Sequence, residues 1–132
     1  MKKLTFYLAA VLVITAALTS CSSEKEEGDT VIIKNEFVTA VSGPATGNTN
    51  QEIIFQVTYN VDSSCATFSQ YIQTTSSNLK TIEVQVKYLG DCSPSPATAT
   101  QPYKFVVIQP GTYTFKFKSG PSAYITKTVA VQ

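Results

Sequence analysis

The chain has 132 residues, enough for one domain, and only 14% of them are charged. It contains no histidine and no arginine. Histidine, the commonest general base and metal ligand, is therefore missing. Arginine, which binds phosphate through two parallel hydrogen bonds, is missing as well. Setting aside Lys2 and Lys3 leaves eight lysines against nine acidic residues, a side-chain net charge of −1. We expect no nucleic-acid binding, because that function needs a basic face.

Residues 1–20 have the three parts of a secretory signal peptide. Lys2 and Lys3 give it a positive start, residues 4–18 form a mostly apolar run, and Thr19 and Ser20 are small. The run is shorter than the roughly 20 residues that a transmembrane helix needs. We interpret this segment as a cleaved leader, in preference to a buried N-terminal helix of the domain.

The sequence Leu18-Thr19-Ser20-Cys21 resembles the lipobox of bacterial lipoproteins. The resemblance implies that the sulfur of Cys21 receives a diacylglycerol, and that the leader is cut just before this residue. It also implies that the new amine is often acylated, for example with palmitate. Two or more acyl chains anchor a protein stably in a bilayer. An ordinary cleavage site beside a free cysteine is the alternative.

Residues 21–29 continue from this cysteine as a short polar and acidic segment. Its composition predicts a disordered tether. It is also similar to the acidic stretch of surface-exported lipoproteins in Bacteroidota-type bacteria. That resemblance implies a lipid anchor in the bacterial outer membrane, with the domain on the cell surface. A plain spacer on a lipoprotein that faces the periplasm is the alternative.

Residues 30–132 show strand signals and no convincing helical period, although a helical turn near residues 68–71 is possible. The clearest alternations of apolar and polar residues lie at 52–61 and 79–88. Residues 42–50 and 90–102 are rich in turn formers and predict loops. The expected strands cover residues 31–41, 52–61, 66–75, 79–88, 103–108, 112–118 and 123–131.

Several apolar side chains outside the clearest alternations are expected to face the core. In the irregular first strand these are Ile33, Phe37 and Val41. In the strand at 66–75 they are Phe68, together with Tyr71 or Ile72.

Seven strands in about 100 residues predict an all-β fold, a seven-stranded antiparallel immunoglobulin-like β-sandwich. The pattern of the domain at 30–132 is similar to small immunoglobulin-like and fibronectin-III-like modules. The core tryptophan of antibody domains is missing, since the chain has no tryptophan. A small barrel is the alternative fold.

Two cysteines remain once Cys21 is assigned to lipid. Thiols outside the inner membrane tend to be oxidised, so we predict a disulfide between Cys65 and Cys92 that joins two loops at one end of the sandwich. Two unpaired cysteines are the alternative. Asp62 precedes Cys65 by three positions, Asp91 directly precedes Cys92, and both are interpreted as turn residues. A calcium ion shared by the two is the weaker alternative, because no Asp-x-Asp ladder accompanies them. No metal and no cofactor is expected.

The expected function is non-catalytic binding or adhesion to a glycan or protein of the envelope or surroundings. Loops on such scaffolds commonly carry function, which points to residues 43–50 and 91–102. The candidate contact residues are Tyr71, Tyr88, Tyr103 and Tyr124. The alternative role for these tyrosines is packing within the sandwich, because strand tyrosines are usually half-buried.

Two other functions compete with direct binding of a ligand. An accessory subunit of an envelope complex could pair with a partner through an exposed edge strand. An enzyme inhibitor is a weaker alternative. An enzyme is not expected, because the sequence has no Ser-His-Asp set, no metal-ligand cluster and no phosphate-binding loop.

Overall fold

The computed structural model describes residues 30–90 and 92–132, and within these ranges the chain forms nine strands. In chain order they are β1 (Val31–Glu36), β2 (Val38–Ser42), β3 (Thr46–Gly47), β4 (Glu52–Val61), β5 (Ala66–Ser76), β6 (Leu79–Leu89), β7 (Ala97–Val106), β8 (Gly111–Lys118) and β9 (Tyr124–Val131). No helix long and apolar enough to cross a membrane occurs in the described part of the chain.

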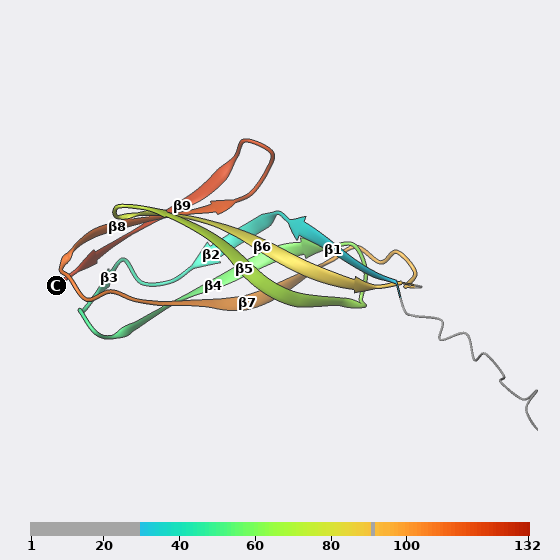
Figure 1. The fold of residues 1–132 in the computed structure, drawn as a ribbon, viewed down its shortest axis with the longest axis horizontal. Coiled ribbons are helices and arrows are strands. Elements are labelled where there is room, and N and C mark those ends of the chain that lie inside the picture. The colour runs from blue at the N-terminus through green and yellow to red at the C-terminus, as the bar shows by residue number, and fades with distance from the viewer. Residues whose placement is uncertain (1–29, 91) are drawn as a thin grey trace, which may run out of the picture.

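The strands form two sheets that face each other along an elongated body (Figure 1). In the larger sheet β6 pairs with β8 through residues 79–82 and with β1 through residues 84–89. β8 then pairs with β9, and β9 with β3. β5 pairs with β6 along residues 79–88. The smaller sheet has the order β2-β4-β7. The fold is therefore all-β with two packed layers, as the sequence predicted.

The clearest sequence alternations build the centre of both layers. The odd-numbered positions of β4 from 53 to 61 are all buried, and β4 spans the residues predicted for it. In β6 the buried positions are Ile82, Val84, Val86 and Tyr88, again as predicted. Side chains alternate between the two faces of a strand, so each of these strands turns one apolar face inward.

Aromatic rings join the two sheets at the middle of the core. The ring of Phe55 in β4 lies 5.2 Å from that of Phe115 and 5.6 Å from that of Phe117, centroid to centroid, and both of these belong to β8. Phe105 in β7 lies 4.3 Å from Phe115. All four rings are less than a tenth exposed. Rings at these separations add specific attraction to the burial of their apolar area.

The prediction of seven antiparallel strands was wrong in number and in direction. Two strand pairs are parallel, β3 with β9 and β6 with β8. The predicted strand at 31–41 divides at Phe37 into β1 and β2, which join different sheets. The two-residue β3 lies in the segment predicted as loop. An immunoglobulin-type sandwich has antiparallel sheets, so that topology is not established for this chain.

The strand predicted at 103–108 begins earlier, at Ala97, and ends at Val106. Residues 97–102 were assigned to a loop because they are small or polar and include Pro102. They pair with the far half of β4, where Pro102 lies opposite Gln56. A proline is tolerated there because β7 is an edge strand, which pairs with β4 alone among the described strands.

Some side chains expected to face the core are exposed. Ile33 is 53% exposed and Phe37 is 38% exposed. Of the two alternatives Tyr71 and Ile72, Ile72 is 36% exposed and Tyr71 is the one that faces the core. Val41 is buried as expected, and Phe68 and Tyr71 pack against the core. The whole of β1 is exposed or half-exposed, even though it pairs with β6. Its residues therefore extend the larger sheet without entering the core.

The predicted disulfide between Cys65 and Cys92 is present, with 6.0 Å between the two Cα atoms. Cys65 directly precedes β5, and Cys92 lies between β6 and β7. The bond therefore joins two connections at the end of the sandwich where β1 begins (Figure 1). The predicted leader at 1–20, the tether at 21–29 and Asp91 lie outside the described residues.

Removing this disulfide is expected to destabilise the domain. Replacing both cysteines, as Cys65→Ser with Cys92→Ser, frees a loop with a sequence separation of 27. In the chain-entropy model this lowers the free energy of unfolding by roughly 3–4 kcal/mol. Urea unfolding of the parent and the double variant measures the loss. An unchanged midpoint in urea would contradict the assigned role of the bond.

Candidate ligand-binding site

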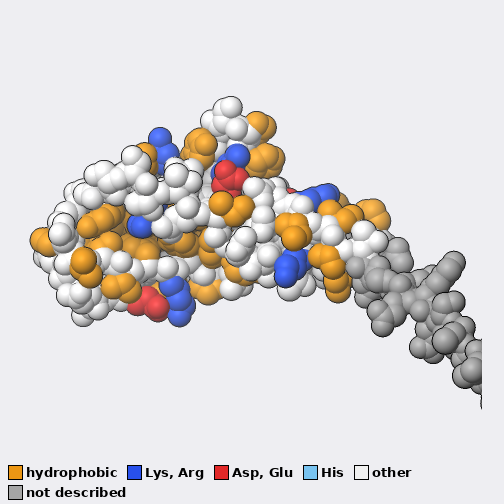
Figure 2. Space-filling view, viewed as in Figure 1, with side chains coloured by type: hydrophobic (Ala, Val, Ile, Leu, Met, Phe, Trp, Pro, Cys, Tyr) orange, Lys and Arg blue, Asp and Glu red, His pale blue; other side chains and the backbone are white. Residues whose placement is uncertain are grey.

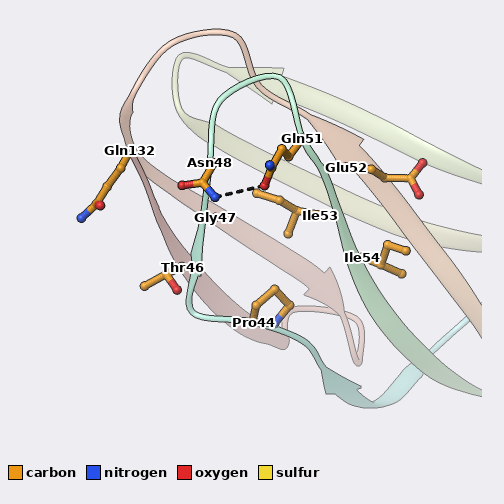
Figure 3. Close-up of a pocket in the computed structure, with 9 residues that line it drawn as sticks. All are labelled: Pro44, Thr46, Gly47, Asn48, Gln51, Glu52, Ile53, Ile54 and Gln132. Atoms are coloured by element: carbon orange, nitrogen blue, oxygen red, sulfur yellow. Dashed lines mark hydrogen bonds between the residues drawn. The ribbon is translucent and has the colours of Figure 1, made fainter.

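A cavity of about 560 Å³ opens at the end of the sandwich opposite the disulfide (Figure 3). The segment between β2 and β4, the start of β4 and the residue after β9 form its walls. In Figure 3, Asn48 and Gln51 meet across the loop, and Pro44 lies on the opposite side of the opening. The lining residues are Pro44, Thr46, Gly47, Asn48, Gln51, Glu52, Ile53, Ile54 and Gln132.

Backbone hydrogen bonds hold the loop of this cavity in place. The amide of Thr49 donates to the carbonyl of Gln132 at 2.9 Å, and the amide of Gln132 donates to that of Gly47 at 3.1 Å. The amide of Asn50 donates to the carbonyl of Val107 at 2.8 Å. The loop is thus attached both to the end of the chain and to the connection between β7 and β8. Such a cavity is largely formed before any ligand arrives.

Two local conformations allow the loop to lie so close to β4. Asn50 has a φ of 61°, in the left-handed region that asparagine tolerates better than most residues. A Cβ atom on Gly47 would lie 2.3 Å from Cδ1 of Ile53, so a larger residue here would displace that buried side chain. The glycine therefore lets the backbone pass directly over Ile53.

The polar groups of the cavity carry little net charge. Asn48 donates from Nδ2 to Oε1 of Gln51 at 3.0 Å, and both side chains are exposed. Glu52 is the carboxylate of the lining, and it lies 3.2 Å from Nζ of Lys104. Amide groups both donate and accept hydrogen bonds. The site can therefore bind a neutral ligand with many hydrogen-bonding groups, over the apolar surface of Pro44 and Ile54.

Two of the predicted contact tyrosines pack where the edges of the sheets meet. Tyr71 in β5 donates its hydroxyl to the carbonyl of Gln101 in β7 at 2.8 Å. Tyr103 in β7 donates to Oε1 of Gln73 in β5. Burial raises the pKa of Tyr71, and it raises that of Tyr103 to about 12. These side chains join β5 to β7, so they have the packing role that was the alternative for them.

Tyr88 is also mostly buried, at the disulfide end. Its hydroxyl accepts from the amide of Asp62 at 3.0 Å and donates to Glu36 at 2.7 Å. Burial raises its pKa to about 12. Nζ of Lys34 lies 5.3 Å from the ring centroid and also donates to Asp62 at 2.6 Å. Asp62 is thus engaged by a lysine and by Tyr88.

A second cavity of about 360 Å³ lies beside Tyr88 and the disulfide. Ser63, in its wall, is 4% exposed, and its hydroxyl has no hydrogen-bond partner among the described residues. Part of the predicted loop at 91–102 lines this cavity, while the loop at 43–50 lines the first one. The two predicted loops therefore lie at opposite ends of the molecule. The remaining lining residues are Ile32, Lys34, Asp62, Leu89, Gly90, Cys92, Pro94 and Pro96.

Tyr124 is the most exposed of the four predicted tyrosines, at 43%. It lies at the start of β9, where Nζ of Lys116 is 5.9 Å from its ring centroid. It lines neither of the two cavities described above. The predicted tyrosines are therefore not brought together into one binding surface.

Sequence reasoning found the loop of the first cavity but missed its other walls. Gln51, Glu52 and Ile54 were assigned only to a strand and its approach, and Gln132 was not considered. The three amide side chains within residues 48–51, Asn48, Asn50 and Gln51, were a signal that could have been used. The contribution of Gln132 depends on the parallel pairing of β3 with β9, which no local pattern reveals.

No family model matches this chain, and the comparisons with curated proteins and with solved structures found no match. Among the described residues, no group of three or more His, Cys, Asp or Glu side chains could hold a metal ion.

The buried tyrosines predict a loss of stability in strong base. An unfolded tyrosine ionises near pH 10, whereas Tyr103 keeps its proton up to about pH 12 in the fold. The stability from this difference is complete below pH 10 and is lost as the pH rises to about 12. Urea unfolding at several pH values measures it. The free energy of unfolding of the Tyr103→Phe variant is expected to fall less steeply with pH across this window. A slope equal to the parent's would contradict the raised pKa of Tyr103.

Proposed function

We propose that the protein is a lipid-anchored, non-catalytic binding module that acts outside the cytoplasm. In this proposal the leader at 1–20 is removed, Cys21 carries the acyl chains, and residues 21–29 tether the domain at 30–132. The lipobox-like sequence supports the anchor. The disulfide supports an oxidising compartment, because such bonds are rare in the cytosol. The membrane is the bacterial outer membrane, with the domain on the cell surface or, alternatively, in the periplasm.

The proposal that the domain binds a ligand rests on the position of the first cavity. The described chain begins at the disulfide end, and the cavity lies at the other end, next to the last residue, Gln132 (Figure 1). β4 runs between the two ends, and its ten residues span about 33 Å. A domain tethered through Thr30 would hold this cavity away from the membrane, where a ligand outside could reach it.

The chemistry of the cavity favours a neutral glycan as the ligand. Sugar hydroxyls both donate and accept hydrogen bonds, and so do the exposed amides of Asn48 and Gln51. Pro44 and Ile54 offer apolar surface to the C–H face of a sugar ring. The lining contains no aromatic residue, so stacking on a ring contributes nothing at this site. Glu52, already paired with Lys104, disfavours an anionic ligand.

Binding is tested by applying the protein to a glycan array and titrating the best neutral glycan by calorimetry. Replacing both amides, as Asn48→Ala with Gln51→Ala, is expected to weaken binding at least about tenfold, since two hydrogen-bonding groups are lost. Gln70→Ala is the matched control, because Gln70 is an exposed amide on β5, bonded to Gln85 and outside the cavity.

Two results would overturn this proposal. One is that no glycan binds. The other is that a glycan binds the double amide variant as tightly as it binds the parent, which would place the binding site elsewhere on the molecule.

A further inference from the structure

Four large apolar side chains are exposed at the disulfide end of the larger sheet. Val31 is 49% exposed, Ile32 45% and Ile33 53%, and Leu89, opposite Val31 in β6, is 49% exposed. We call this group the apolar tip. In Figure 2 hydrophobic side chains gather at the end of the body where the described chain begins. Exposed apolar groups of this kind mark contact with a partner or a membrane when they are contiguous.

The apolar tip is exposed on both faces of the sheet. Ile32 pairs with Tyr88, whose side chain faces the core, so Ile32 points to the inner side and lines the second cavity. Val31 and Ile33 alternate with it and point to the outer side. A flat protein partner would cover one face and leave the other in water. A medium that surrounds the end of the sheet covers both.

The tip follows directly on the segment that would carry the anchor. Cys21 precedes Thr30 by nine positions, and a chain of that length spans at most about 30 Å. Its root-mean-square span as a flexible tether is about 16 Å. An acylated Cys21 would therefore keep the tip close to the bilayer at high effective concentration, so even weak affinity would suffice. This step rests on the anchor in the proposed function.

We propose that the apolar tip inserts into the surface of the bilayer that holds the acyl chains. The partner is thus a lipid surface, and the depth is that of the boundary between headgroups and acyl chains. Among the described strands β1 pairs only with β6, so its outer edge keeps unpaired backbone groups. Such groups cannot enter hydrocarbon without losing their hydrogen bonds. Insertion is therefore shallow and is made by side chains.

Lysines lie directly behind the tip, at the depth expected for lipid headgroups. Lys34 follows Ile33 in β1, and the exposed Lys87 pairs with Ile33 across the ladder. Their stems can cover apolar surface while the ammonium groups reach phosphate. Lys34 is already paired with Asp62, which leaves Lys87 as the stronger candidate for a headgroup contact.

The lack of tryptophan in the chain allows a direct test, because one introduced tryptophan reports alone. Full-length lipidated Ile33→Trp is reconstituted into vesicles of phosphatidylethanolamine and phosphatidylglycerol, with and without brominated acyl chains. Ile108→Trp is the matched control, since Ile108 is 76% exposed but lies at the opposite end, between β7 and β8. We expect bromine to quench the tryptophan at position 33 at least about twofold, with a blue-shifted emission, and to leave that at 108 unchanged.

Flotation of the vesicles is measured first, because it tests the anchor at Cys21 independently of insertion of the apolar tip. Protein that does not float with the vesicles lacks the anchor and overturns this inference, whereas the glycan test of the cavity stands independently. Protein that floats but shows equal emission at positions 33 and 108 in both kinds of vesicle also overturns it. In that case, cross-links between copies through β1 would identify a second copy of the chain as the partner.

Discussion

The packing of aromatic rings between the two sheets is the interaction on which the rest of the structure depends. Phe55 from the smaller sheet contacts Phe115 and Phe117 from the larger one, and all three are fully buried. The three-stranded sheet buries its apolar face in the same core as these rings. Truncating such a ring costs on the order of 3–5 kcal/mol, a large fraction of the stability of a domain this size. These rings fix the sheets against each other and hence the positions of both ends.

The domain is a rigid body, and its two ends carry different structural features. The disulfide, the apolar tip and the first described residue share one end, and the amide-lined cavity and Gln132 share the other. Tyr71 and Tyr103 join β5 to β7 along the side. In the proposed function the first end faces the membrane and the second faces outward. The domain then needs no conformational change to present its cavity.

The strands with one buried face could be predicted from the sequence. The prediction failed for segments whose structure depends on pairing with strands distant in the sequence. β4 and β6 were found because every second residue is apolar, and Cys65 and Cys92 because only one pair remained. Residues 97–102 were missed because they are small or polar and include a proline, whereas a strand at a sheet edge can be built without large apolar side chains. Ile33 was placed in the core, but it pairs with the exposed Lys87 and points to the outer face of the larger sheet, which the irregular pattern at 31–41 does not reveal. The walls of the cavity depend on contacts between the loop, β4 and the residue after β9.

The acyl anchor at Cys21 is the central claim, because it decides which end of the sandwich faces the membrane. Mass spectrometry of the protein purified from its native membrane tests it most directly. The account predicts a mature chain that begins at Cys21 and carries the mass of a diacylglycerol, with or without a further acyl group on the amine. An unmodified peptide that still spans positions 18–24 of the mature protein would contradict it.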